Sequence, residues 1–251
     1  MRPLSAAEML SVWERGQARA PAERALALLA AACPEETADA LAGLPVGRRD
    51  ARLMVLREWT FGPRLASVAV CPACGDRLEI GAGVADLLVP VEEAPPDRLE
   101  VEVGGHRLAL RLPDSRDLMA LAGAGDLPAL RRRLLGRCLL AVSRQGEPET
   151  DPLPDDFPDN LPDAVVGAAA ARLAAADPQA DVRLSLGCPA CGHSWLAVFD
   201  IVTFFWREIE TWAVRTLREV HTLATAYGWR EVDSLALSPW RRQIYLQMVG
   251  G

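Results

Sequence analysis

The pentapeptide Cys-Pro-Ala-Cys-Gly occurs twice in this sequence, at residues 71–75 and again at residues 188–192. Two residues between the cysteines allow both sulfurs of one copy to bind a single metal ion. The glycine after the second cysteine tolerates the positive φ angle that such a turn needs. Together the two copies predict one tetrahedral site with four sulfur ligands, which are Cys71, Cys74, Cys188 and Cys191.

Zinc is the ion that we expect at this site, because four thiolates at this spacing are typical of structural zinc. A cross-link that closes so long a loop costs about 4–5 kcal/mol, whereas structural zinc binding contributes roughly 10–16 kcal/mol in small peptides. The free energy of zinc binding therefore exceeds the cost of closing the loop. Four thiolates leave no coordination position for a substrate or for His193, so a catalytic zinc is not expected.

Two redox dithiols or two disulfides are the alternatives for the same four cysteines. A thioredoxin-type dithiol places its first cysteine at the start of a helix. Here each cysteine pair is followed by strand-like sequence instead, at residues 78–80 and 195–199. The pattern is more typical of metal-binding turns in β-hairpins.

Composition indicates a globular protein, since 50% of the residues are apolar and 24% are charged. No apolar run reaches the length of a membrane span, and Glu8 and Glu14 interrupt the pattern of a signal peptide. We therefore expect a cytoplasmic protein, which agrees with zinc thiolates. Cys33 and Cys138 stand in segments rich in alanine and leucine, so we expect both to be buried, unreactive side chains.

The charge balance argues against a nucleic-acid partner. The formal net charge is −7, and every basic residue is arginine. Binding to a polyanion draws its affinity from clustered positive charge. The one dense basic run, residues 131–133 with Arg137, lies in a leucine-rich helical pattern and is expected to be a solvated helix face.

Helices are expected at both ends of the chain. Residues 1–65 predict a bundle of four helices, which starts with a capping box at Ser5 and Glu8. The further helices are expected to begin at Pro21, at Pro34 and at about Asp50. Residues 201–251 predict a long helix that ends at Gly228, a short helix at 232–237 and a last helix from Pro239.

The middle of the chain predicts a zinc ribbon that is split by an insertion. Residues 66–90 and 179–200 each carry a strand, a cysteine pair and a second strand, and in the first of them Gly81–Gly83 is expected to turn the chain. Between these two halves, residues 91–178 predict a subdomain that consists of a β-hairpin and helices. Its expected parts are a linker at 90–96, a hairpin at 99–112 around Gly104-Gly105, helices after Pro113 and from Pro128 to about Val142, an acidic loop at 145–163 and a helix at 164–175. The fold class is therefore α+β, with helical terminal segments around the split ribbon.

Four segments of the sequence resemble one known protein family. They are Trp13–Gly16 in the opening helix, Thr60–Leu65 before the first cysteine pair, Arg111–Leu118, and the tail from Ala226 to Leu246. In this order they resemble the T-even-type baseplate and tail-assembly proteins of contractile phage tails and contractile injection systems. The resemblance implies a structural or assembly (chaperone-like) protein without enzymatic activity, assembled in the bacterial cytoplasm. Its implied partners are other baseplate, hub or tail proteins.

The residues themselves are compatible with that role but leave two others open. Trp206, Trp212, Trp229 and Trp240 crowd the C-terminal segment, where one or two could anchor an interface. A nucleic-acid-binding zinc-ribbon adaptor is the main alternative, although the acidic charge counts against it. The long-short-long helix order at the C-terminus resembles a helix-turn-helix only superficially, because its last helix carries just Arg241 and Arg242. A zinc enzyme is the third possibility, and it would need an open metal site.

Overall fold

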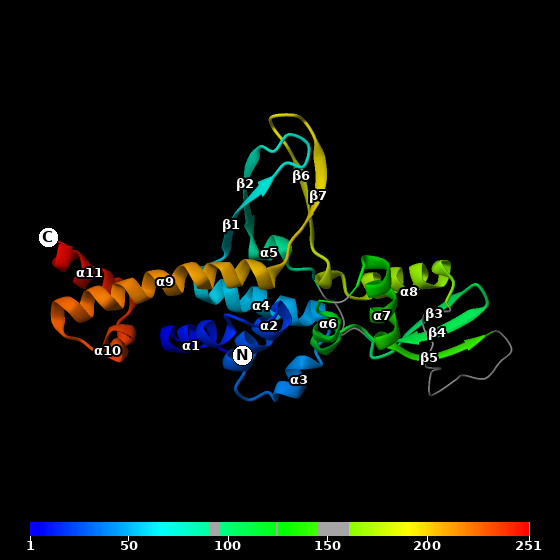
Figure 1. Cartoon of the computed structure of the whole chain (residues 1–251), viewed down its shortest axis with the longest axis horizontal. Coiled ribbons are helices and arrows are strands. Elements are labelled where there is room, and N and C mark those ends of the chain that lie inside the picture. The colour runs from blue at the N-terminus through cyan, green and yellow to red at the C-terminus, as the bar shows by residue number, and fades with distance from the viewer. Residues whose placement is uncertain (91–95, 124, 145–160, 251) are drawn as a thin grey trace.

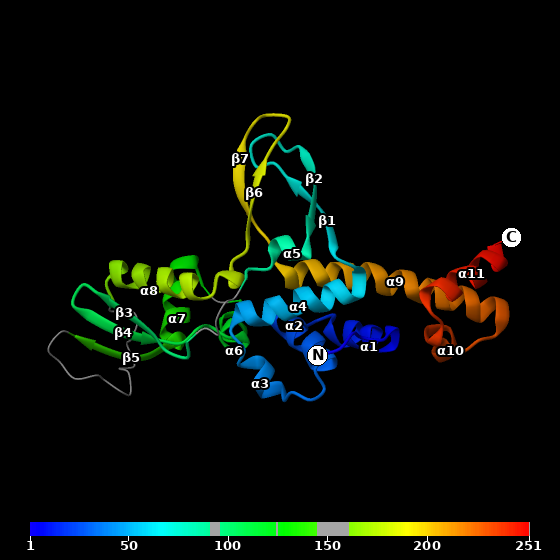
Figure 2. The same cartoon turned by 180° about the vertical axis from the view of Figure 1, so that it is seen from behind.

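The computed structural model describes residues 1–90, 96–123, 125–144 and 161–250. The chain forms an elongated molecule with a helical body at its middle, from which two β-hairpins project to one side (Figure 1). A mixed subdomain lies at one end of the long axis, and the C-terminal helices lie at the other end. The same arrangement is seen from behind in Figure 2. The helices of the body are α1 (Ala6–Gly16), α2 (Pro21–Ala32), α3 (Ala38–Ala42), α4 (Val46–Phe61) and the first half of α9 (Ile201–Tyr227).

The helical body is held together by one apolar core to which all its helices contribute. The predicted capping box begins α1, since Ser5 Oγ accepts a hydrogen bond from the Glu8 backbone and Glu8 accepts one from the Ser5 backbone. In α9, Phe205, Trp206 and Ile209 are buried against α1, α2 and α4. A Cβ atom on Gly16 would lie 2.2 Å from the Trp206 ring, so the close contact between α1 and α9 requires glycine there.

Two helices of the body start at other residues than the sequence predicts. The third helix, α3, starts at Ala38 and not at Pro34, because Thr37 accepts a hydrogen bond from the Ala40 backbone and so caps the helix. Helix α4 starts at Val46, earlier than the expected Asp50, and it begins directly after Pro45.

The two projecting hairpins follow α4 and precede α9. The first consists of β1 (Arg64–Val70) and β2 (Arg77–Gly83), and the second consists of β6 (Arg183–Gly187) and β7 (Ser194–Val198). The prediction of a turn at Gly81–Gly83 is wrong, because these residues pair with the start of β1 as part of β2. The short helix α5 (Val84–Leu87) follows and buries Val84 and Leu87 in the core of the body.

The mixed subdomain contains a second, separate core. The predicted hairpin is present as β3 (Leu99–Val103) and β4 (His106–Leu110), with Gly104 and Gly105 in the turn at φ values of 58° and 75°. Both φ values lie in the left-handed region, which a two-residue turn of this kind needs. The other elements are α6 (Ser115–Leu121), α7 (Leu127–Cys138), β5 (Leu139–Arg144), α8 (Asp163–Ala176) and a short 3₁₀ helix, η1 (Pro178–Ala180).

The helix predicted to run from Pro128 to about Val142 ends earlier, at Cys138. Residues 139–144 form β5 instead, which pairs with β4 and completes a three-stranded antiparallel sheet. Leu139, Ala141 and Val142 are buried on this strand. The leucine-rich sequence favours a helix locally. Pairing with the open edge of β4 and burial in the core of the subdomain stabilise a strand instead, so tertiary contacts determine the structure of this segment.

The C-terminal segment is part of the core at its start and exposes aromatic residues toward its end. Helix α9 ends at Gly228, which has the left-handed φ of 68° expected of a C-cap. The helices α10 (Glu231–Ala236) and α11 (Pro239–Gly250) follow, and Arg242 binds Glu219 of α9 at 2.8 Å. Of the four tryptophans in this segment, Trp206 is buried, Trp212 and Trp229 are half-buried, and Trp240 is exposed.

Helix and strand thus occur together, as the α+β class requires. The predicted linker at 90–96 and acidic loop at 145–163 fall mainly outside the described residues. Within the part of the chain that is described, no helix combines the length and apolar character that crossing a bilayer requires.

Candidate metal centre

The two cysteine turns have the same backbone geometry. In the first, the Gly75 N–H donates to the Cys71 carbonyl at 3.0 Å and the Cys71 N–H donates to the Asp76 carbonyl at 2.8 Å. In the second, Gly192 donates to Cys188 at 2.9 Å and Cys188 donates to His193 at 2.8 Å. The glycine of each turn has a positive φ, 78° at Gly75 and 74° at Gly192. The repeated sequence therefore folds into the same turn twice.

The two turns meet at the tips of the hairpins, and all four sulfur atoms lie within 4.8 Å of one another. The Sγ atoms of Cys71 and Cys191 are 3.7 Å apart, and those of Cys74 and Cys188 are 3.6 Å apart. Four sulfurs at about 2.3 Å from one tetrahedral ion would be about 3.8 Å from each other. These spacings fit such an ion, and they are far too long for disulfides, in which the sulfurs are about 2.05 Å apart.

The electrostatics of the cluster also favour a cation. Burial opposes ionisation of Cys71, but the backbone N–H groups of Cys74 and Ala73 donate to its sulfur and lower its pKa to about 7. The Asp76 backbone lowers the pKa of Cys74, yet the neighbouring thiols outweigh it and raise that pKa to about 12. The pKa of the Cys71 thiol is therefore lowered, whereas the pKa values of Cys74 and Cys191 are raised. A divalent cation would remove this conflict, because it stabilises all four thiolates at once.

The other residues that the sequence suggests as possible site residues do not belong to the sulfur cluster. The ring of His193 stacks on Trp195 with their centroids 6.0 Å apart, and His193 is outside the group of possible ligands. Cys33 and Cys138 are fully buried, as predicted, and burial raises the pKa of the Cys138 thiol to about 12.

The prediction of a solvated helix face at residues 131–133 and Arg137 holds in part. Arg131 and Arg133 are exposed on α7. Arg132 is half-buried and binds the Leu161 carbonyl and Asp163, and Arg137 donates to the buried Asp117.

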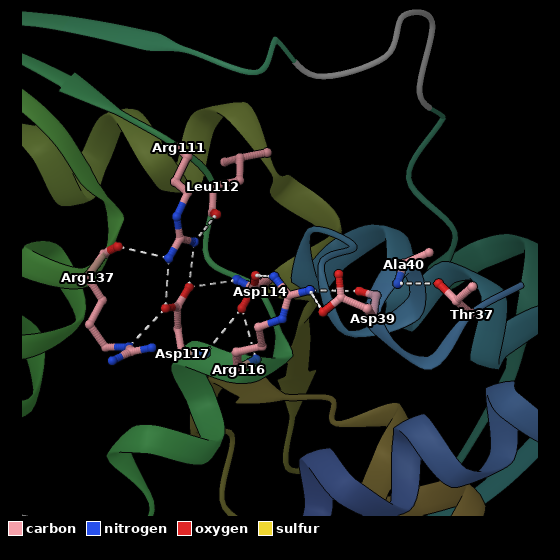
Figure 3. Close-up of polar contacts among 9 residues, drawn as sticks. All are labelled: Thr37, Asp39, Ala40, Arg111, Leu112, Asp114, Arg116, Asp117 and Arg137. Carbon is pink, nitrogen blue, oxygen red and sulfur yellow. Dashed lines mark hydrogen bonds and ion pairs between the residues drawn. The ribbon is translucent and has the colours of Figure 1, made fainter.

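A second polar centre lies where the mixed subdomain joins the helical body (Figure 3). The carboxylate of Asp117 is fully buried and accepts hydrogen bonds from both terminal nitrogens of Arg111, at 2.6 and 2.9 Å. Arg137 donates to the same carboxylate at 2.9 Å, and the Asp114 backbone N–H donates at 3.0 Å. Asp117 therefore ties α6 to the end of β4 and to α7.

The same segment reaches the helical body through its other charged residues. Arg116 donates to both the carbonyl and the carboxylate of Asp39 in α3, at 2.8 and 2.5 Å. The Val46 N–H at the start of α4 donates to the Pro113 carbonyl at 3.0 Å. The sequence predicts a helix after Pro113 and shows a family resemblance at residues 111–118, but it does not predict the contacts of this junction. The alternating arginine and aspartate residues were the signal for this junction.

Replacing Asp117 with asparagine is expected to destabilise the protein by about 2–4 kcal/mol, because two guanidinium groups lose their shared carboxylate. Burial alone would raise the pKa of Asp117, but the hydrogen bonds from Arg111 and Asp114 overcome it and hold the pKa below its ordinary value. A carboxylate with a lowered pKa stabilises the fold above the unfolded value of about 3.9, and this contribution is lost as the pH falls further. The difference in the free energy of unfolding between the wild type and the Asp117→Asn variant should therefore become smaller below about pH 4.

Denaturant unfolding of both proteins between pH 3 and pH 7 measures this difference. Glu102→Gln is the matched control, because Glu102 pairs with Arg107 on the exposed surface of the same subdomain. That change should cost at most about 1 kcal/mol. If Asp117→Asn lowered the free energy of unfolding at neutral pH by no more than the control does, the junction would not stabilise the fold.

The fold and these two centres define a class of protein: a mixed helix-and-strand scaffold whose paired hairpins bring four cysteines together. Comparison with protein-family models gives the family, since residues 6–206 match the model described as T4 bacteriophage base plate protein. The chain belongs to that family, and membership indicates a structural role in a phage baseplate. The matched residues include both cysteine turns and the junction, whereas the tail at 226–246 lies beyond them. Neither the curated proteins nor the solved structures gave a match.

Proposed function

We propose that the protein is a non-enzymatic structural or assembly (chaperone-like) component of the baseplate of a contractile phage tail or related injection system. The family match over residues 6–206 is the observation that supports this most directly. The proposed partners are other baseplate, hub or tail proteins, and the proposed site of assembly is the bacterial cytoplasm. No small-molecule substrate is part of the proposal.

A structural zinc ion is the second part of the proposal, with Cys71, Cys74, Cys188 and Cys191 as its ligands. The sulfur spacings support it, as does the pairing of one buried and one exposed cysteine from each turn. Zinc would join the tips of two hairpins that share no backbone hydrogen bonds between their strands in the described structure. In this way one ion would hold together the two halves of a split zinc ribbon.

The division of the chain follows from the same proposal. Residues 1–65 form the N-terminal bundle and residues 201–251 form the C-terminal helical segment. The two ribbon halves are residues 66–90 and 179–200, and the inserted subdomain is residues 91–178. The separate apolar cores of the helical body and of the inserted subdomain support the separation of residues 91–178, while residues 1–65 and the start of 201–251 share one core.

Deletion of the gene in the organism that encodes it tests the baseplate role. Cells without the protein should produce sheath and tube proteins but no complete contractile particles in electron micrographs, and the intact gene supplied in trans should restore them. Mass spectrometry of purified wild-type particles then separates two roles, because a subunit remains in the particle and an assembly factor does not. A normal yield of intact particles after deletion would contradict the proposal.

A further inference from the structure

Four large apolar side chains are exposed on the strands of the projecting hairpins. Val68 and Val70 on β1 are 48% and 59% exposed, and Leu196 and Val198 on β7 are 61% and 70% exposed. Along β7 these exposed residues alternate with half-buried ones, so they share one face of the strand. Exposed apolar side chains on projecting hairpins are typical of an interaction surface.

The backbone of β7 is also free along one edge. At the two ends of the second hairpin, Cys188 donates to the His193 carbonyl and Phe199 donates to the Val182 carbonyl. In the antiparallel register between these ends, hydrogen-bonded and non-hydrogen-bonded pairs alternate. Leu196 and Val198 fall on the non-bonded positions, so their N–H and C=O groups point away from β6. In the described structure β6 is the only strand that pairs with β7.

A pocket of about 580 Å³ lies at the foot of this edge, against α9. Val198 and Phe199 line it from the end of β7, and Phe204 and Trp212 line it from α9. Its volume is in the range that accommodates one or two large side chains of a ligand. The exposed face of β7 therefore continues into a pocket of mixed character, in which aromatic side chains lie beside charged and hydroxyl groups.

Two arginines and two carboxylates line the pocket. Arg207 and Arg215 are exposed there. Within the described part of the chain Arg215 has a loose contact, 3.8 Å to Glu219, and Arg207 has no ion pair.

Of the two carboxylates, Glu208 pairs with the buried Arg57 at 2.6 Å. The exposed Asp200 caps α9 by accepting from the Val202 backbone at 2.9 Å, and it has no cationic partner among the described residues. The Glu208–Arg57 pair is neutral, so the two arginines and Asp200 leave one formal positive charge at the pocket, in a protein whose net charge is negative. This excess favours a negatively charged ligand.

We propose that an extended, acidic and apolar segment of a partner protein binds here as an added β-strand. Its backbone pairs with the free edge of β7 at Leu196 and Val198, its apolar side chains cover these residues and enter the pocket, and its carboxylates reach Arg207 and Arg215. Open strand edges bind extended peptides in this manner. The identity of the partner as a baseplate protein rests on the proposed function, whereas the chemistry of the surface does not.

Synthetic peptides test the surface in the full-length protein. The probes are two ten-residue peptides, one alternating valine with glutamate and the other alternating valine with lysine, with binding followed by fluorescence anisotropy. The acidic peptide should bind, and the lysine peptide should bind at least about tenfold more weakly. In the acidic peptide, N-methylation of one alternate set of amides should abolish binding, and N-methylation of the other set should not, because a strand pairs along one edge only. Absence of binding, equal binding of the two peptides, or insensitivity to both sets of N-methyl groups would overturn the proposal.

Charge reversal locates the bound peptide on the molecule. The double variant Arg207→Glu, Arg215→Glu should lose the acidic peptide and prefer the lysine peptide. The control Arg241→Glu changes an exposed arginine on α11 that does not line the pocket, and should behave as the wild type. An unchanged preference in the double variant would overturn the proposal.

The same double variant separates this inference from the proposed function. In cells that lack the gene, it should fail to restore contractile particles. Full restoration by the double variant would overturn the docking surface and leave the baseplate role standing. Intact particles in the deletion strain would contradict the baseplate role, whatever the peptides do.

Discussion

Replacing Cys188 with serine should remove the metal from the protein and disorder both hairpins, while the helical body remains folded. Cys188 is a buried member of the sulfur cluster, and its loss leaves three thiolates around the proposed ion. Structural zinc contributes roughly 10–16 kcal/mol to the folding of small zinc peptides. The body keeps its own apolar core, so the damage should be confined to residues 64–83 and 183–198.

Elemental analysis and hydrogen exchange measure the two parts of this prediction. Zinc should fall from about one ion per chain to nearly none, and amide protection should disappear in both hairpins. Cys138→Ala is the matched control, because it removes a buried thiol outside the cluster and should leave the zinc content unchanged. Hairpins that stay protected in metal-free Cys188→Ser protein would show that the metal does not hold them together.

Replacing Glu208 with alanine should destabilise the protein by about 3–5 kcal/mol, because it leaves a buried guanidinium without its carboxylate. Arg57 is only 2% exposed, and it binds both carboxylate oxygens of Glu208, at 2.8 and 2.6 Å. After the change, the Gly62 carbonyl at 2.6 Å is its one remaining hydrogen-bond partner among those found in the described structure. This pair joins α4 to α9 beside the start of the first hairpin, so its loss should also increase the mobility of that hairpin.

Urea unfolding of single and double variants separates the ion pair from its packing. In Arg57→Met, Glu208→Ala no charge is left buried, so the double variant should be more stable than Glu208→Ala alone. Asp233→Ala is the control for a surface ion pair, since Asp233 binds the exposed Arg230, and it should cost at most about 1 kcal/mol. A double variant that is less stable than the single one would mean that Arg57 contributes chiefly through its other contacts.

Much of the fold could be predicted because local signals coincide with tertiary structure in this chain. The Ser5–Glu8 capping box, the Gly104-Gly105 turn and the Gly228 C-cap each specify a local backbone geometry, and all three are present. The identical cysteine pentapeptides also specify identical turns. That the four sulfurs lie together follows from the chemistry of their spacing, whereas the identity of the ion stays a prediction.

Most of the features that were missed depend on partners that are distant in sequence, whereas the start of α3 depends on the local cap at Thr37. Residues 139–144 have the composition of a helix, and only the open edge of β4 makes them a strand. Likewise Gly81–Gly83 has the composition of a turn, and the register with β1 keeps it extended. The buried Asp117 carboxylate binds Arg111 and Arg137. The alternating arginines and aspartates at 111–117 indicate a polar cluster, but they do not give its partners on α7 and α3. In these last cases the deciding contact is long-range.

X-ray absorption spectroscopy of the purified full-length protein at the zinc edge tests the central claim most directly. The account predicts about one zinc ion per chain with four sulfur neighbours at about 2.3 Å and no nitrogen or oxygen neighbour. Protein that contains no zinc, or zinc with nitrogen or oxygen among its ligands, would contradict it.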